Sequence, residues 1–366
     1  MLHTIKKVTA KIVGGANIAS ILVMLAVGYS DHLNPLEHHL LSQMGLTFPI
    51  FLFINLCFLL FWLLFYRRGV WIAVAGLLLC YVPVRKYTPI NMPVDPPQGS
   101  IKFLSYNLLA FSSLIGEPDG YNPALRYIST SGADIICLQE GLCGGVTPQE
   151  LDSAMASYAY HDSTPSNNKN DLLRIYSRYP ILRSQRIQYA SNGNLSMAYW
   201  LRIGRDTVIV INNHFESNGL NKIDKDGFKS MVKGKLETDS VKRESRRLLD
   251  KLITAGRKRA PQAEAVARFI AQHKGTSMIV CGDFNDTPIS YTHRTVARGL
   301  TDCYVASGLG PGISYHLSGF YVRIDNILCT PDWKPYGCKI DNKIGASDHY
   351  PIYCWLKKTP IEHKKE

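Results

Sequence analysis

Carboxylate, amide and imidazole side chains recur beside short apolar runs after residue 100. They comprise Asn107 after FLSY, Glu140 after IICLQ, His214 after VIVINN, Asp283 and Asn285 after MIVCG, Asp325 in RIDNIL, and Asp348 with His349 before YPIYCWL. Loops that follow strands at one edge of a sheet form the binding and catalytic sites of α/β proteins. We therefore expect these side chains to meet at one edge of a sheet.

These residue types suit the hydrolysis of a phosphoester. That reaction needs a cation to neutralise the phosphoryl group, a water molecule in line with the leaving oxygen, and stabilisation of that oxygen. Glu140 and Asp348 are hard carboxylate ligands for the cation, with Asn107 as an adjacent amide ligand or phosphate donor. Asp325 would hold His349 in one tautomer. The chain contains no GxxxxGK[ST] phosphate loop, no GxSxG elbow and no HExxH motif.

The apolar runs that carry these residues predict an α/β domain. The predicted strands span 101–106, 135–138, 173–177, 197–203, 207–212, 278–281, 324–329 and 350–356, where β-favouring residues are bounded by turn residues. Helical periodicity marks 123–131, 148–157 and 262–273. A domain over residues 100–358 is long enough to bury a sizeable core.

Seven motifs in this domain resemble, in order, those of the endonuclease/exonuclease/phosphatase superfamily. They are SYNLL, ICLQE, SRYPI, NNHFES, GDFND, RIDNIL and SDHYPI, and the similarity runs from about Ile101 to Leu356. The superfamily includes DNase I-like nucleases, neutral sphingomyelinases and inositol-polyphosphate 5-phosphatases. The resemblance implies a DNase I-like four-layer αββα sandwich, in which helices flank two packed mixed sheets. It also implies a divalent-metal-dependent phosphoesterase.

The resemblance also suggests a role for each site residue. It places Mg²⁺, or alternatively Mn²⁺, on Glu140, Asp348 and Asn107. Asp283 and His349 both compete for the role of activating water, and the sequence leaves that choice open. Asn285 would donate to the phosphate, and His214 would contact the scissile phosphate or assist the leaving group. Asn107, His214 and Asn285 are therefore the expected substrate-binding residues.

Three uncharged apolar stretches precede this domain, over residues 12–29, 46–66 and 69–84. A spanning helix needs about 20 apolar residues, so the third stretch is short, but flanking Arg and Lys side chains can reach the interface from its ends. We expect residues 1–86 to form a transmembrane anchor. The overall composition, 46% hydrophobic and 19% charged, excludes a disordered chain, a collagen and a coiled coil.

The basic residues of the short loops predict the orientation of this anchor. Three lysines precede the first stretch, the loop over 30–45 has no Lys or Arg, and Arg67 with Arg68 follow the second stretch. The positive-inside rule then places the N-terminus inside and everything after residue 86 outside. This arrangement looks like that of the superfamily's bacterial glycopeptide-resistance-type members, so we expect a multi-pass protein of a bacterial-type cell membrane with an extracytoplasmic domain. If the third stretch lay only in the interface, the domain would be cytoplasmic, and Arg85 with Lys86 would fit that alternative better.

Two further segments bear on the substrate. Residues 87–99 read YTPINMPVDPPQG, a Pro-rich linker that would hold the domain close to the membrane. A basic insertion over about 217–261 follows the His214 strand and has 13 Lys or Arg against six Asp or Glu between 222 and 259, out of a net charge of +12 for the chain. Such runs are usually solvated helical faces, but basic segments beside a bilayer also gain about 1 kcal/mol per residue from anionic headgroups.

Together these features favour a membrane-associated or lipid-linked phosphorylated substrate. The alternative is a membrane-tethered nuclease, in which the basic run would follow a phosphate backbone and binding would depend steeply on salt. A non-catalytic binding module on the same fold is disfavoured because no motif residue is replaced. The sequence leaves the oligomeric state open.

Overall fold

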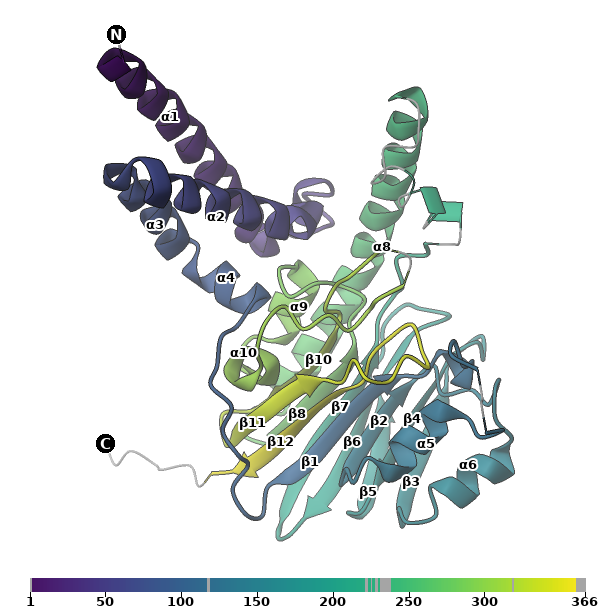
Figure 1. Cartoon of the computed structure of the whole chain (residues 1–366). Helices are drawn as coiled ribbons and strands as arrows, with labels where there is room; N and C mark the ends of the chain where they lie inside the picture. The colour runs from purple at the N-terminus through teal and green to yellow at the C-terminus, as the bar shows by residue number, and fades with distance from the viewer. Residues whose placement is uncertain are drawn as a thin grey trace.

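Figure 1 shows a β-sandwich with apolar N-terminal helices standing on one side of it. The structure is a computed structural model that describes residues 2–116, 119–220, 223–224, 226–227, 230, 238–317 and 319–359. It confirms the predicted four-layer αββα sandwich preceded by long apolar helices.

The N-terminal helices, here called the anchor, comprise four α-helices joined by 3₁₀ turns. They are α1 (Leu2–Gly28), η1 (Ser30–His32), η2 (Leu41–Thr47), α2 (Phe48–Phe65), η3 (Arg67–Gly69), α3 (Val70–Leu79) and α4 (Tyr81–Tyr87). Two helical stretches, Lys6–His32 and Leu41–Phe65, are long and apolar enough to cross a membrane. Arg67–Leu79 and Tyr81–Tyr87 would make a third span if that pair, bent by 67°, counts as one.

Pro83 accounts for the bend between α3 and α4. Proline has no N–H, so it cannot donate to the carbonyl of Leu79 four residues earlier. That carbonyl instead accepts a hydrogen bond of 3.0 Å from the hydroxyl of Tyr29. The anchor also has a buried polar contact, in which Asn17 Nδ2 donates to Asn55 Oδ1 at 3.1 Å and joins α1 to α2.

Two six-stranded mixed sheets form the sandwich. The first has the order β11-β12-β1-β2-β4-β3, and the second β5-β6-β7-β8-β10-β9. The pairs β1/β2 and β7/β8 are parallel and the other pairs are antiparallel. The bounds are β1 Ile101–Asn107, β2 Ile135–Gln139, β3 Tyr160–Pro165, β4 Leu172–Ser177, β5 Ile181–Arg186, β6 Leu195–Ile203, β7 Asp206–His214, β8 Ser277–Asp283, β9 Thr301–Asp302, β10 Asp325–Cys329, β11 Trp333–Ile340 and β12 Ile352–Lys358.

Helices cover the outer face of each sheet. On the first sheet, α5 (Pro123–Thr130) and α6 (Pro148–Ala154) pack over β1 and β2; on the second, α8 (Thr238–Gln272) and α9 (Tyr291–Val296) pack over β7 and β8. The short elements η4 (Leu109–Phe111) and α10 (Cys303–Ser307) complete the domain. The core between the sheets is apolar, but Gln139 Nε2 donates to Asn212 Oδ1 at 2.6 Å and so joins β2 to β7.

Some elements differ from the sequence expectations for identifiable reasons. The sequence does not predict β3, β5 and β9, because they are short or have few apolar residues. It does not predict β11 either, because Pro335 and Gly337, two residue types that are rare in strands, interrupt its pattern. Helix α8 begins at Thr238 rather than residue 262 and continues through Pro261. Much of the predicted basic insertion, at 221–222, 225, 228–229 and 231–237, lies outside the described residues.

The predicted linker over residues 87–99 lies against the domain. It has no helix or strand after α4, but Ile90 forms an isolated β-bridge with Leu309. The side chain of Asn91 donates to the carbonyls of Val305 and Gly308 at 3.1 and 2.7 Å. The connection between the anchor and β1 is therefore held in place by specific hydrogen bonds.

Candidate active site

Strand register brings the polar side chains to one edge of the sandwich. The parallel strands β7 and β8 end level, with His214 opposite Asp283. Because β10 runs antiparallel to β8, it begins where β8 ends, and its first residue Asp325 is paired with Asp283. In the facing sheet, Asn107 ends β1 and Glu140 directly follows the parallel strand β2.

Asp283, only 1% exposed, lies at the centre of the group. Its Oδ2 accepts hydrogen bonds from the side-chain amides of Asn107 at 3.1 Å and Asn285 at 3.3 Å. The same oxygen lies 3.7 Å from Nε2 of His214 and 3.6 Å from Nε2 of His349. Asp283 is therefore placed to exchange a proton with either imidazole or with a water molecule between them.

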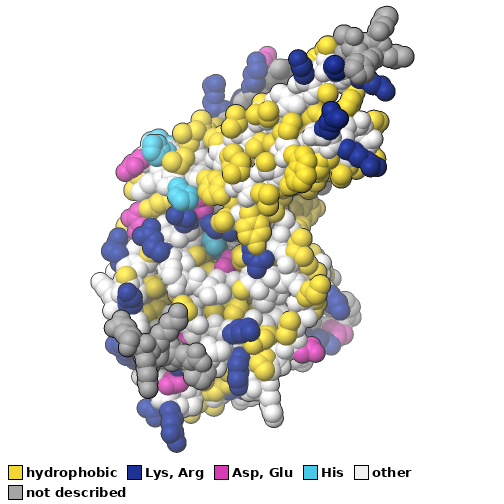
Figure 2. All heavy atoms as spheres, turned by 90° about the vertical axis from the view of Figure 1, so that its left-hand side faces the viewer, with side chains coloured by type: hydrophobic (Ala, Val, Ile, Leu, Met, Phe, Trp, Pro, Cys, Tyr) yellow, Lys and Arg dark blue, Asp and Glu magenta, His cyan; other side chains and the backbone are white. Residues whose placement is uncertain are grey.

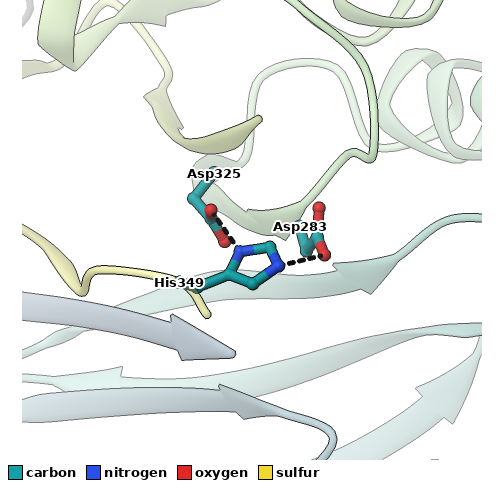
Figure 3. A group of neighbouring side chains, drawn as sticks. All are labelled: Asp283, Asp325 and His349. Carbon is teal, nitrogen blue, oxygen red and sulfur yellow. Dashed lines mark hydrogen bonds and ion pairs between the residues drawn. The ribbon is translucent and has the colours of Figure 1, made fainter. Parts of the chain in front are cut away.

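Each of these imidazoles is held by a second carboxylate. His349 Nδ1 lies 2.8 Å from Asp325 Oδ2, the contact drawn in Figure 3, and His214 Nδ1 lies 2.7 Å from Asp171 Oδ2. Both pairs are buried. An Asp that bonds Nδ1 fixes the tautomer and the ring orientation, so that both Nε2 atoms face Asp283.

Two residues of this site were missed in the sequence. Asp171 directly precedes β4, and its one sequence signal is an Asp in NDLL, which is typical of a turn. Tyr315 follows no predicted strand, yet its ring packs edge-on against the imidazole of His349 with centroids 5.2 Å apart. No sequence signal identifies Tyr315, because its contact with His349 forms only when two loops distant in the sequence fold together.

Two site residues have left-handed backbone conformations, Glu140 with φ 48° and Asn285 with φ 51°. Non-glycine residues in this region cost about 1–3 kcal/mol each and persist only where their surroundings hold them. Asp171 Oδ1 accepts the backbone N–H of Glu140 at 3.1 Å, and Asn285 Nδ2 donates to the carbonyl of Phe215 at 2.9 Å. These contacts hold both side chains toward the site.

The carboxylates determine the charge of the imidazoles. Burial alone would lower the pKa of each ring, but the neighbouring carboxylates outweigh it and raise the pKa of His214 and of His349 to about 10. The strongest such neighbour is Asp171 for His214 and Asp325 for His349. Burial also raises the pKa of Asp283 to about 6, against the opposing charges of both imidazoles. In the metal-free chain at neutral pH, both imidazoles are therefore protonated on both ring nitrogens and positively charged.

One group of donors lies close enough together to hold a divalent cation, and the group that the sequence predicts is a separate one. Asp283, Asp325 and His349 each offer a ligand atom within 4.8 Å of the others, and Asp325 Oδ1 is buried without a hydrogen-bond partner among the described residues. The predicted group of Glu140, Asp348 and Asn107 contains only oxygen ligands, and both of its carboxylates line one cavity. Oxygen ligands suit Mg²⁺, whereas an imidazole also suits transition metals such as Mn²⁺.

This cavity, of about 130 Å³, has one polar and one apolar group of lining residues. The polar group comprises Glu140, Ser217, Asn218, Asp283, Asn285, Asp348 and His349. The apolar and aromatic group comprises Leu220, Tyr315, Phe320, Val322 and Ile324. The cavity can therefore receive a charged group together with an apolar or planar one.

The structure brings together every residue that the sequence proposed for the site. They are Asn107, Glu140, His214, Asp283, Asn285, Asp325, Asp348 and His349. Their individual roles stay predictions. The arrangement places the buried carboxyl group of Asp283 between two positively charged imidazoles. Carboxylates that could bind a cation line the adjoining cavity.

Comparison with protein-family models gives two matches. The model described as the endonuclease/exonuclease/phosphatase family matches residues 104–349. The model described as a domain of unknown function (DUF8431) matches residues 10–87. No curated protein sequence matches the chain significantly.

Several solved structures have a similar fold. The human Nocturnin catalytic domain, solved with a bound sulfate anion, is 17% identical with a TM-score of 0.50, over 73% of this chain and 96% of that one. An endonuclease/exonuclease/phosphatase from Beutenbergia cavernae is 14% identical with a TM-score of 0.49, over 71% of this chain and 72% of that one. Humanized TDP2 from D. rerio is 13% identical with a TM-score of 0.47, over 71% of this chain and 99% of that one. At 17% identity, the Nocturnin comparison shows a shared fold.

Proposed function

Because the chain belongs to the endonuclease/exonuclease/phosphatase family and is thus a metal-dependent phosphoesterase, we propose that it hydrolyses a phosphoester of a membrane lipid or lipid-linked molecule. One observation carries the choice of substrate. Asp283 ends β8, the loop that follows contains Asn285 and continues to Ile289, and Ile289 packs among side chains of the anchor. The active-site edge thus adjoins the apolar helices that we propose lie in the membrane.

The proposed topology has three spans with the domain on the extracytoplasmic side of a bacterial-type cell membrane. The loop between α1 and α2 packs against α9, where Asn34 Nδ2 lies 3.4 Å from the hydroxyl of Tyr291, and α4 packs against α10. These two parts of the anchor thus lie on the domain's side. Figure 2 supports a membrane position, because apolar side chains cover much of the anchor on the face shown, and Lys and Arg gather toward its far end.

The shape of the cavity agrees with a lipid phosphoester. A phosphate would occupy its polar part, beside Asp283 and Asn285. Phe320, Leu220 and Val322 would then contact the apolar part of the same molecule. A bilayer lipid presents these two chemical parts next to each other.

The proposed roles follow from the charges. A bound divalent cation would neutralise the phosphoryl group, with Glu140 and Asp348 as carboxylate ligands. Asp283 is the stronger candidate to accept the proton of the attacking water, because its pKa of about 6 leaves it mostly ionised at pH 7 while His349 is protonated. Protonated His214 would donate to the phosphate or to the leaving oxygen.

The long helix α8 adds positive charge near the anchor. Gln43 of η2 packs against Gly256, near the middle of α8, and the preceding part of the helix extends past the sheets on the anchor's side of the sandwich (Figure 1). Its exposed residues there include Lys242, Arg243 and Arg246, which make no ion pair in the described part of the chain. We propose that this segment attracts anionic headgroups.

An activity assay of the full chain in detergent micelles tests the proposal. With Mg²⁺ present, it would compare sphingomyelin, phosphoinositides and isoprenyl diphosphates with plasmid DNA, using Asp283→Ala as the inactive control. We expect metal-dependent hydrolysis of at least one lipid and none by the variant. Hydrolysis of DNA alone would contradict the lipid proposal and favour the nuclease. Inactivity on every substrate would favour a binding module.

A further inference from the structure

The anchor contacts the loop that directly follows the central carboxylate of the site, Asp283 at the end of β8. Ile289 follows Asp283 closely in the chain and is 1% exposed. Ile289 belongs to an apolar cluster whose other buried members come from the anchor: Met24, Val27, Phe48, Leu52 and Cys80. The loop over 284–290 therefore has one end in the active site and the other in the anchor.

Gly45 of η2 makes this contact possible. A Cβ at Gly45 would lie 2.1 Å from the carbonyl oxygen of Ile289 and 3.1 Å from Cγ2 of the same residue. Gly45 is buried, and its backbone is not in the left-handed region, so glycine is needed here for space rather than for conformation. The backbone of the anchor thus lies directly against the backbone of the loop.

The opposite side of the loop is fixed by a buried arginine. Arg259, 1% exposed, lies with Nε 3.3 Å from Asp286 Oδ2 and donates through a second nitrogen to Asn218 Oδ1 at 2.8 Å. Asn218 in turn donates to the carbonyl of Asn285 at 3.3 Å. The loop is therefore held on one side by the anchor and on the other by Arg259, and Asn218 links Arg259 to the backbone of Asn285.

We propose that η2 is part of the catalytic scaffold, and that Gly45 and Ile289 are positioning residues that hold Asp283 and Asn285 in the geometry the reaction needs. The anchor then does more than tether the domain, because its seating on the loop sets the turnover of the enzyme. The inference rests on the phosphoesterase activity of the family and not on the proposed lipid substrate. It is therefore tested with a soluble substrate.

The test compares Gly45→Ala with Gly15→Ala in the full chain, assayed on bis(p-nitrophenyl) phosphate with Mg²⁺ or Mn²⁺ in detergent. Gly15 is an exposed anchor glycine at which an added Cβ would meet no atom within 4 Å, so it is a matched control. Misplacing a reacting group by about 1 Å can lower turnover about 100-fold. We expect kcat per folded molecule to fall at least about tenfold for Gly45→Ala, with KM within about twofold, and Gly15→Ala to match the wild type. A folded Gly45→Ala protein with wild-type kcat would overturn the proposal.

A second pair of variants decides the matter if Gly45→Ala does not fold. Ile289→Ala removes most of the side chain from the anchor cluster, whereas Ile289→Val keeps its β-branched shape. We expect kcat to fall at least about tenfold for the Ala variant and to stay within about twofold for the Val variant, again at nearly constant KM. Wild-type kcat for both folded variants would overturn the proposal, because a merely structural contact would change stability and leave the turnover of the folded enzyme unchanged.

Discussion

Oδ2 of Asp171 lies 2.7 Å from Nδ1 of His214, and both side chains are buried. The other oxygen of Asp171 accepts two backbone N–H groups, those of Glu140 and Leu172. The carboxylate is thereby fixed on both sides. It holds the imidazole with Nε2 toward Asp283 and also orders the backbone of Glu140, so one residue links two parts of the site.

Replacing Asp171 with Asn should lower turnover without much change in substrate binding. The amide carries no negative charge, so the strongest of the contacts that oppose the effect of burial would be lost, and the pKa of His214 would fall from about 10. Loss of a positioned proton donor typically costs about 10²-fold or more in rate. We expect kcat to fall by about that factor, measured at pH 7.5 on a soluble phosphodiester with KM from the same curves.

Asp152→Asn is the control for this change. Asp152 is exposed on α6 and does not line the active-site cavity, so the same chemical substitution should leave kcat within about twofold of the wild type. Equal activity of the two variants would mean that the charge of Asp171 has no part in the reaction.

The sequence allowed the edge of the sandwich to be predicted because each site residue adjoins a recognisable apolar run. Asn107 and His214 end strands whose buried patterns are nearly continuous, and parallel pairing then places strand ends together. Asp171 has no such signal, since one Asp before a strand is typical of a turn. Its role depends on β4 lying beside β2, which is a tertiary fact.

The contact between the anchor and the site was also beyond sequence reasoning. Gly45 and Ile289 are ordinary residues in their local context, one in an apolar stretch and the other before a helix N-cap. Their importance comes from a backbone approach between segments more than 240 residues apart, and no local propensity encodes it. Close packing of this kind is visible only in the folded chain.

Metal binding should depend on Glu140 more than on Asp325. Glu140 lines the cavity together with Asp348, whereas Asp325 is not among the cavity-lining residues and its Oδ2 contacts Nδ1 of His349. We expect Glu140→Gln to weaken Mn²⁺ binding at least about tenfold and to abolish activity at ordinary Mg²⁺ concentrations. Titration of the metal-free protein with Mn²⁺, followed by electron paramagnetic resonance, measures this.

The controls for the metal experiment separate the two donor groups. Glu150→Gln, at an exposed capping position on α6, should bind Mn²⁺ like the wild type. Asp325→Asn should lower kcat while changing metal affinity less than Glu140→Gln. The reverse order of affinities would place the ion on Asp283, Asp325 and His349 instead.

The raised pKa of Asp283 predicts how stability depends on pH in the metal-free protein. Burial disfavours its charged form, so its pKa rises from the usual 3.8 to about 6. The neutral carboxyl of Asp283 therefore contributes to the free energy of unfolding fully below about pH 4, and this contribution is lost as the pH rises through about 6. In EDTA, Asp283→Asn should therefore raise Tm by several degrees at pH 7.5 and leave it nearly unchanged at pH 4.

Thermal unfolding in detergent, followed by fluorescence at both pH values, provides the measurement, with Asp152→Asn as the exposed control. A lower Tm for Asp283→Asn at pH 7.5 would be the contrary result. It would mean that the hydrogen bonds to the charged carboxylate, including that from Asn107, outweigh the cost of its burial.

The basic segment of α8 should affect activity only where the substrate lies in an anionic surface. Arg243 and Arg246 are exposed, and each would gain about 1 kcal/mol from attraction to anionic headgroups. The double variant Arg243→Gln/Arg246→Gln should therefore lower activity about tenfold in proteoliposomes that contain anionic lipid. The same variant should match the wild type on a soluble phosphodiester.

Arg202→Gln/Arg205→Gln removes two exposed charges near the β6–β7 turn, at the end of β7 opposite His214, and serves as the matched control. Equal losses for both double variants would show a nonspecific charge effect, and a loss on plasmid DNA alone would favour the nuclease.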